Sequence, residues 1–312
     1  MGFLCFFCGF LSLPGMAYLN RNSSWRNLYL YTSIPSILYC VLVKFLVRES
    51  PRWLLVKGRK EEAADTLRCI ASISQSSLNL ALSKVCENEE SSDESMDLFS
   101  ALKVLMQRQW AFRRIKAVML MGVGLGLVYY GMPLGLGTLS FNLYLSVTFN
   151  ALSELPASLV TLVLIDKLNR RIAIWVFTII SGILSFLSVM ELGGTWTKLV
   201  IGFESLSFFS ACTAFNIYLL YTTELFPTCV RNSALAMARL AAVLGGAVSP
   251  VVVAAGRRNK FWCYGVFGLV VWLSGVFVVL LPETRGRKLC DTMEEEEEGK
   301  QKVMSSSSHL LV

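Results

Sequence analysis

Residues 117–137 read AVMLMGVGLGLVYYGMPLGLG and contain no charged side chain. The hydrocarbon core of a bilayer is about 30 Å thick, and a helix needs about 20 mostly apolar residues to cross it. Segments of about ten residues with alternating polarity, which are typical of a membrane β-barrel, do not occur in the sequence. The sequence therefore predicts an all-α membrane protein with eight transmembrane helices, the other seven at residues 2–19, 28–47, 139–165, 172–189, 199–221, 233–255 and 261–281.

Charged residues gather between and after these stretches. Of the 312 residues, 54% are hydrophobic and 16% are charged, whereas a soluble domain carries about 25% charged residues. A water-soluble globule is therefore excluded. Lys and Arg number 21 in the connections on one side of the predicted bilayer and six on the other, so the positive-inside rule places both chain termini in the cytoplasm. The basic side would contact anionic lipid, and nothing in the sequence indicates nucleic acid as a partner. Either the plasma membrane or the vacuolar membrane would fit this charge distribution.

The polar connections divide the chain into four parts. Residues 1–47 hold two predicted helices, and residues 48–116 form a cytoplasmic loop with two short amphipathic helices, at 60–73 and 97–109. Residues 117–281 hold the other six predicted spans. The remaining residues, 282–312, are expected to form a cytoplasmic and mostly disordered tail, because a run of glutamates followed by serines has no apolar period.

Patterns that would indicate an enzyme or a metal site are absent from the sequence. It contains no HExxH, GxSxG or Walker loop. The single histidine, His309, lies far from the Cys5-x-x-Cys8 pair, which has no further ligands nearby. We therefore expect no catalytic activity, no metal and no cofactor.

Ionisable residues inside a predicted span are costly and indicate function by default. Glu154 lies in the middle of its stretch, two residues before Pro156. It is either a carboxylate that attracts a cation or carries a proton, or one member of a buried ion pair, for instance with Arg239. Arg239 in turn is either a substrate or gating contact or a structural partner. Glu204 lies nearer to a helix end and could simply face water.

Aromatic and amide side chains add further candidates for a substrate cavity. Tyr129, Tyr130, Asn216 and Tyr218 could supply cation–π and hydrogen-bonding contacts. Helix packing or an aromatic belt at the membrane interface explains any single one of them equally well. The many glycines of residues 122–137 indicate either close helix packing or a moving gate helix.

Four short polar motifs resemble those of the major facilitator superfamily. Residues 166–171 (DKLNRR) resemble its D-x-x-G-R-R signature, with Asn169 in place of the glycine; the others are ELFPTCVRN at 224–232, PETRG at 282–286 and ESPRWL at 49–54. In such motifs the Asp caps a helix end and the arginines bind carbonyl and carboxylate groups of neighbouring helices. The resemblance implies a latch that breaks as the transporter changes face, made here by Asp166, Arg170, Arg171, Glu224, Arg231 and Glu283.

A narrower resemblance points to the organic cation/carnitine transporter family, particularly its plant members. It rests on YYG at 129–131 leading to ELPA at 154–157, and on GFLSLPG at 9–15 followed by Trp25-Arg26. By this resemblance the chain has a partial major facilitator fold whose eight spans correspond to the fifth to twelfth of twelve. Residues 1–47 are then the last two helices of the N-terminal half, and residues 117–281 are the six-helix C-terminal half.

The same resemblance implies alternating-access transport of a small organic cation or a zwitterion such as carnitine, coupled to H⁺ or Na⁺. Glu154 would be the carboxylate of the cavity, and Tyr129, Tyr130 and Asn216 would line it. The pocket departs from the cation members, because Val243 stands where they carry Asp and Asn216 where they often carry Glu. With only part of the fold, the chain is expected to transport poorly alone and to need a missing N-terminal half. The alternatives are a truncated isoform that binds full-length transporters without transporting, and a sugar porter.

Overall fold

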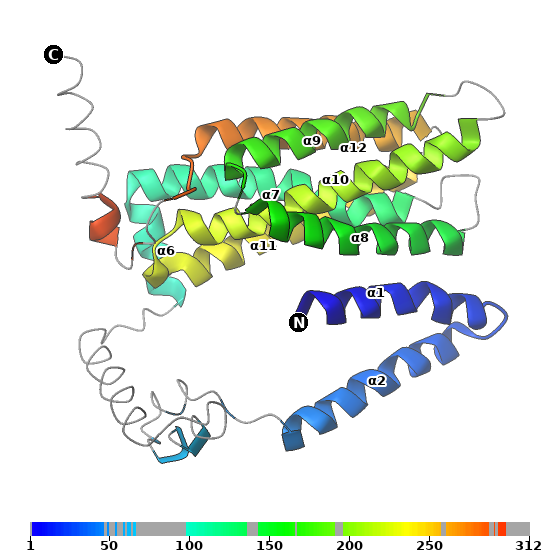
Figure 1. Ribbon diagram of the computed structural model, residues 1–312, viewed down its shortest axis with the longest axis horizontal. Helices are drawn as coiled ribbons and strands as arrows, with labels where there is room; N and C mark the ends of the chain where they lie inside the picture. Colours follow the sequence, from blue (N-terminus) through cyan, green and yellow to red (C-terminus); the bar gives the residue numbers. More distant parts are fainter. Residues whose placement is uncertain are drawn as a thin grey trace. The chain divides into compact units, whose positions relative to one another are not determined.

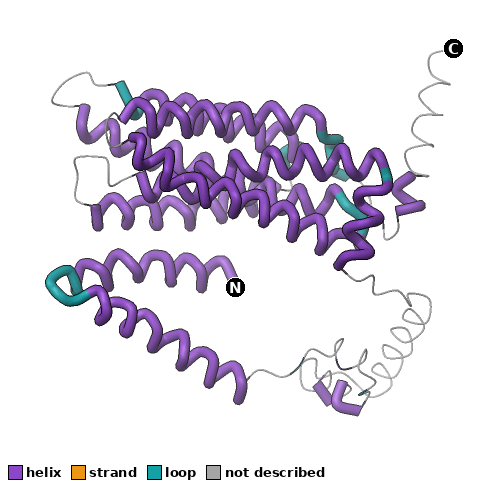
Figure 2. Tube along the Cα trace, turned by 180° about the vertical axis from the view of Figure 1, so that it is seen from behind, coloured by secondary structure: helices purple, strands orange, loops and turns teal. Residues whose placement is uncertain are grey.

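A computed structural model describes residues 2–46, 49, 54, 59, 61–63, 65–66, 98–135, 143–165, 167–190, 196–256, 260–286, 290 and 293–297. Over this part of the chain the regular structure is helical, without a strand (Figure 2). The chain divides into two compact units, one of residues 1–18 and 96–312 and the other of residues 19–95. The larger unit holds the six-helix bundle in which the candidate site lies, and the smaller unit holds one long helix.

Eight long helices coincide with the eight apolar stretches of the sequence (Figure 1). Their bounds are α1 Gly2–Leu19, α2 Trp25–Leu46, α7 Gln109–Gly135, α8 Leu143–Ile165, α9 Arg170–Leu187, α10 Trp196–Leu225, α11 Thr228–Gly256 and α12 Lys260–Phe277, the last continued by the 3₁₀ turn η2 Val278–Leu280. Within the described ranges, seven helices are long and apolar enough to cross a membrane, and the apolar part Gly9–Leu19 of α1 is shorter. The all-helical membrane fold is thus confirmed.

A short helix in the polar connection is also confirmed. The amphipathic pattern at 97–109 corresponds to α6 Leu98–Gln107, which directly precedes α7. The pattern at 60–73 falls largely outside the described residues, although residues 61–63 and 65–66 are helical. There Ala63 is buried and packs with Leu54.

Close packing of α7 against α11 forms the centre of the bundle and rests on glycines. A Cβ atom added to Gly126 would overlap the backbone carbonyl of Ala242, and one added to Gly245 would overlap the carbonyl oxygen of Val123. The two backbones therefore touch, as small residues allow in membrane helix pairs. This contact favours close packing as the reason for the glycine-rich sequence of α7.

Part of the C-terminal tail is ordered against this bundle. Residues 293–297 form a helical turn, and the Met293 side chain is only 3% exposed. The carbonyl oxygen of Cys290 accepts a hydrogen bond from the backbone N–H of Thr228 at the start of α11, at 3.1 Å. The acidic run was expected to lack order, but over these residues its carboxylates have partners that the sequence pattern does not reveal.

Those partners are basic and aromatic side chains at the start of α7. Glu297 accepts hydrogen bonds from Arg108, at 3.1 Å, and from the indole N–H of Trp110, at 2.9 Å. Arg114 is 7% exposed; its Nη1 donates to the carboxylate of Glu296 and to the carbonyl of Leu225, both at 2.9 Å. Arg114 thus satisfies a free carbonyl at the end of α10 while it holds the tail.

Candidate functional site

Three polar side chains share the face of α8 that contacts α7 and α10. Asn150, Glu154 and Ser158 follow one another at intervals of four residues, so each lies about one helical turn from the next. Asn150 is fully buried, Glu154 is 8% exposed and Ser158 is partly buried. We call these three residues the polar face of α8. Each of them forms a hydrogen bond to a side chain on another helix.

Glu154 is paired with a phenol and not with a cation. The hydroxyl of Tyr129 on α7 donates a hydrogen bond of 2.6 Å to its Oε1. Tyr129 in turn stacks on Phe215 with ring centroids 4.5 Å apart, and its ring meets the edge of Tyr130 at 5.1 Å. The Glu154 carboxylate thus contacts one ring of an aromatic cluster, and no described basic side chain forms a salt bridge to it. The arrangement can attract a positive charge that the bundle itself does not supply.

Some of the other candidate residues lie close to the Glu154–Tyr129 pair. The amide nitrogen of Asn216 on α10 lies 3.5 Å from the hydroxyl oxygen of Ser158, so Asn216 reaches the polar face of α8. Tyr130 is 43% exposed, and its ring packs beside Gly246 of α11. Tyr129, Tyr130 and Asn216 are therefore gathered around the pair that Glu154 forms.

Two other candidates lie differently. Tyr218 is completely buried, and its hydroxyl lies 3.1 Å from the carbonyl of Val118 and 3.3 Å from that of Ala238, so it braces α10 against α7 and α11. Arg239 is exposed on α11 and forms no salt bridge with the described residues, so the pairing of Arg239 with Glu154 that the sequence left open is not observed. The Tyr218 hydroxyl is therefore used in helix packing, whereas the Arg239 guanidinium is an exposed cation near mid-helix with no described counter-ion.

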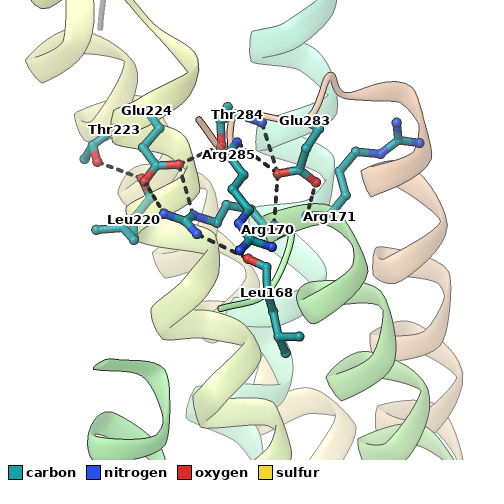
Figure 3. Close-up of polar contacts among 9 residues, drawn as sticks. All are labelled: Leu168, Arg170, Arg171, Leu220, Thr223, Glu224, Glu283, Thr284 and Arg285. Atoms are coloured by element: carbon teal, nitrogen blue, oxygen red, sulfur yellow. Dashed lines mark hydrogen bonds and ion pairs between the residues drawn. The ribbon is translucent and has the colours of Figure 1, made fainter. Parts of the chain in front are cut away.

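A second constellation, which we call the charge network, joins the ends of α9, α10 and α12 (Figure 3). Arg170 binds the carboxylate of Glu224 in two places, from Nε at 3.2 Å and from Nη2 at 3.1 Å. The hydroxyl of Thr284 donates to the same carboxylate at 2.6 Å. The side chain of Arg170 is 12% exposed and that of Glu224 is 22% exposed, so the pair is shielded from water on most sides.

Glu283 takes the place of a missing helix cap. The N-cap residue of α9, Asn169, makes no capping hydrogen bond with its own side chain. Instead the carboxylate of Glu283 accepts the backbone N–H groups of Arg170, at 3.0 Å, and of Arg171, at 3.2 Å. A carboxylate at a helix N-terminus satisfies free donors and complements the helix dipole. The guanidinium of Arg171 completes the connection with a hydrogen bond of 2.9 Å to the carbonyl of Val279.

The backbone around Glu283 explains the rest of its motif. The same carboxylate also accepts the N–H groups of Thr284 and Arg285, at 3.1 and 3.2 Å. The chain then turns through Gly286, whose φ of 75° lies in the left-handed region that favours glycine. The PETRG motif therefore folds into a tight loop around one carboxylate.

Of the other two predicted members of the latch, one lies outside the described residues and one has no described bond to the charge network. Asp166 lies outside the described residues. Arg231 on α11 is described, but its Nε and Nη2 atoms are buried and have no hydrogen-bond partner among the residues that the structure describes. The structure therefore brings together Arg170, Arg171, Glu224 and Glu283.

Sequence reasoning missed three residues that the structure adds. Asn150 and Ser158 extend the polar face of α8, and Thr284 joins the charge network. The spacing of four residues on either side of Glu154 is a signal that could have found the first two. Among the described residues, no three His, Cys, Asp or Glu side chains are placed to hold a metal ion.

An open cleft of about 800 Å³ lies elsewhere, beside the start of α7. Its lining includes Arg108, Arg113 and Glu297. At 1.5 Å per residue, it is roughly 25 Å along α7 from Tyr129. We therefore do not assign it to the site around Glu154.

Comparison with known proteins identifies the family. A family model described as "Sugar (and other) transporter" matches residues 3–295. The chain belongs to the sugar (and other) transporter family. The fold agrees with a solved member of the major facilitator superfamily, the proton:xylose symporter XylE, at a TM-score of 0.60 and 21% sequence identity, over 89% of this chain and 62% of that one. At this identity the likeness shows the fold alone.

Curated relatives within the family are more similar in sequence. The chain is 57% identical to the organic cation/carnitine transporter 3 of Arabidopsis thaliana, over 95% of this chain and 57% of that protein. It is 54% identical to the organic cation/carnitine transporter 2 of the same plant, over 95% of this chain and 58% of that protein. It is also 30% identical to the solute carrier family 22 member 3 of Rattus norvegicus, over 97% and 53%. The recognition from sequence motifs is confirmed, and the chain spans little more than half the length of these relatives.

Proposed function

We propose that this chain forms part of a multi-pass transporter that moves small organic cations, or zwitterions such as carnitine, by alternating access. The observation that carries the proposal is the Glu154 carboxylate, which is 8% exposed and paired only with the phenol of Tyr129 among the described residues. The names of the plant relatives support the same substrate class. The sugar-porter alternative is weaker, because the relatives that are more than half identical are named for organic cations and carnitine.

The chemistry of the site fits a quaternary ammonium group. Such a group has no proton to donate, so it is held by a negative charge and by aromatic faces. Glu154 supplies the charge, and the rings of Tyr129 and Tyr130 supply the faces. We further propose that Asn216 lines the same cavity and that Arg239, which is exposed on α11, contacts the carboxylate of a zwitterionic substrate.

We propose that the charge network, together with Asp166 and Arg231, forms the conformational latch of the transport cycle: the network holds the ends of α9, α10 and α12 together, and the contact that forms and breaks is made at Arg231. Coupling to H⁺ or Na⁺ is part of the same proposal. So is an orientation with both termini in the cytoplasm, in the plasma membrane or the vacuolar membrane. The more basic connections support that orientation through the positive-inside rule.

A binding measurement on the purified chain in liposomes tests the site. Radiolabelled carnitine and tetraethylammonium are expected to bind, and Glu154→Gln is expected to weaken their binding roughly 10- to 100-fold, because a hydrogen-bonded or paired charge contributes about 1.5–3 kcal/mol. Ser153→Ala is the matched control: Ser153 is the preceding residue of α8, and among the described residues its hydroxyl bonds only the carbonyl of Phe149. Equal affinities of the Glu154→Gln variant and the unchanged chain would contradict the proposed site.

Uptake by the same liposomes tests whether the chain can transport without another protein. The chain spans 57–58% of the length of the two Arabidopsis relatives. Alternating access uses two sets of helices that move around a central site. We therefore expect binding without sustained uptake when this chain is the only protein present. Accumulation of labelled carnitine would show that the chain transports by itself.

A further inference from the structure

A second buried carboxylate, Glu204, lies in the bundle and has no role in the site described above. It is on α10, eight residues after the helix begins, and it is 1% exposed. Its carboxylate accepts a hydrogen bond from the amide nitrogen of Asn150 on α8, at 3.2 Å. No described basic side chain forms a salt bridge with it. Glu204 therefore has a neutral partner where a buried carboxylate would ordinarily need a cation.

Two polar atoms around Glu204 also lack partners. The side-chain oxygen of Asn150 and the hydroxyl of Tyr264 on α12 are buried and make no hydrogen bond with the described residues. Asn150 is fully buried, and Tyr264 is 1% exposed. Buried polar atoms without partners are uncommon and call for an explanation. Here one of them belongs to the same amide that donates to Glu204.

A proton explains this arrangement. An ionised carboxylate that is buried with one neutral donor costs several kcal/mol. Adding a proton removes the charge and creates an O–H donor. If the side-chain amide of Asn150 flips so that its oxygen faces Glu204, the O–H of the protonated acid can donate to that oxygen. The ionised carboxylate accepts from the Asn150 nitrogen instead, so Glu204 and Asn150 form a hydrogen bond in both protonation states of Glu204. A hard metal cation would need about six oxygen ligands, and the described residues offer no cluster of three metal-binding side chains.

We propose that Glu204 and Asn150 form a proton-binding site that is separate from the cation site at Glu154. Binding adds one proton to the Glu204 carboxylate, and release returns it to water, with no other bond made or broken. Asn150 and Glu154 lie one turn apart on the polar face of α8. A proton at Glu204 and a cation at Glu154 therefore act on the same helix. This link to transport rests on the proposed function, whereas the proton site itself does not.

Among the described side chains, no group around Glu204 supplies a compensating charge; the side chains of Lys198 on α10 and Lys260 on α12 lie outside the described part. The titratable groups that interact with Glu204 are Tyr264 on α12 and Cys212 on its own helix. On α8, Glu154 lies one turn beyond Asn150 and bonds Tyr129 of α7. On α9, which packs closely against α10, the charged residues are Arg170 and Arg171 at the opposite end of the bundle. On α11, Arg231 and Arg239 lie in the first half of the helix, near the end of α10, whereas Glu204 lies near its beginning.

Infrared spectroscopy of the chain in liposomes tests the proposal without any substrate. A protonated, buried carboxylic acid gives a carbonyl stretching band that is separate from those of ionised carboxylates. We expect such a band at neutral pH in the unchanged chain, and we expect Glu204→Gln to remove it. The matched control, Glu154→Gln, should leave it in place. If the Glu204→Gln variant fails to fold, Asn150→Leu serves instead: it keeps Glu204, and the band should shift as the acid loses its hydrogen bond.

Each outcome of this experiment decides the proposal. Loss of the band in Glu204→Gln, or its shift in Asn150→Leu, supports the proton site. A neutral-pH spectrum that is the same in Glu204→Gln and in the unchanged chain would show that Glu204 is ionised, and would overturn it. A band that Glu154→Gln removes and Glu204→Gln retains would place the proton at Glu154 and also overturns it. Because no organic cation is added, failure of the proposed substrate site leaves these outcomes unchanged.

Discussion

Replacing Glu224 by glutamine breaks the charge network at its most shielded point. The Nε and Nη2 atoms of Arg170 bind the two oxygens of Glu224 at 3.2 and 3.1 Å, and the two side chains are 12% and 22% exposed. Glutamine keeps one acceptor for the hydroxyl of Thr284 but removes the charge. A guanidinium that is largely buried then loses its counter-ion.

The expected cost lies between those of exposed and of fully buried ion pairs. Exposed pairs contribute about 0.2–1 kcal/mol, and removing one partner of a fully buried pair costs about 3–5 kcal/mol. For a two-point contact of intermediate burial we expect Glu224→Gln to destabilise the chain by about 2 kcal/mol. In a chain of this size, that corresponds to a fall in Tm of roughly 4–8 °C, at about 2–4 °C per kcal/mol.

Thermal unfolding in detergent, followed by the fluorescence of the seven tryptophans, measures this change. Glu62→Gln is the control, because Glu62 also binds an arginine in two places but its pair with Arg59 is half exposed, at 50% and 56%. Because Arg59 and Glu62 are three residues apart, an arrangement worth about 0.3–0.5 kcal/mol, that variant should lower Tm by less than about 2 °C. Equal shifts in the two variants would refute the argument from burial, and additive effects of Glu224→Gln and Arg170→Gln would refute the pairing itself.

Two further predictions concern the ends and the centre of the bundle. Gly126→Ala should lower the stability of the chain by about 1–3 kcal/mol, because the added Cβ would overlap the backbone of Ala242. Gly202→Ala is the control and should leave the Tm unchanged, because a Cβ at Gly202 meets nothing within 4 Å. Similar Tm values for the two variants would contradict the α7–α11 contact. Glu283→Ala should increase the amide hydrogen-exchange rates of Arg170 and Arg171 roughly 5- to 30-fold, because the loss of a helix cap costs about 1–2 kcal/mol. Unchanged exchange rates would show that other groups cap α9.

The helices could be predicted from hydropathy, but their ends could not. The third predicted span begins at residue 117, whereas α7 begins at Gln109, because Arg113, Arg114 and Lys116 interrupt the apolar run without ending the helix. Arg114 remains helical and buried because it has the carbonyl of Leu225 and the carboxylate of Glu296 as partners. Such partners are distant in sequence, so no local pattern reveals them.

The same limit applies to the aromatic candidates. Tyr129 and Tyr218 look alike in sequence, since both lie in long helices that are apolar on all sides. Tyr129 reaches Glu154, while Tyr218 fills the space beside Gly122, whose missing side chain leaves room for the phenol. Glu154 itself could be singled out, because a charge in an apolar span is rare. Which tyrosine it pairs with depends on helix rotation, and that is set by the glycine contacts of α7.

The position of the charge network bears on how a latch could work. Its described bonds join α9, α10 and the end of α12, which belong to one helical bundle. Bonds of this kind can stay intact while the bundle moves as one body, so they stiffen the bundle and need not break in a transport cycle. Among the arginines of the motifs that the structure describes, Arg231 differs, because two of its buried nitrogen atoms have no partner. A contact that forms and breaks is therefore better sought at Arg231 than at the Arg170–Glu224 pair, whose bonds are already complete within the bundle.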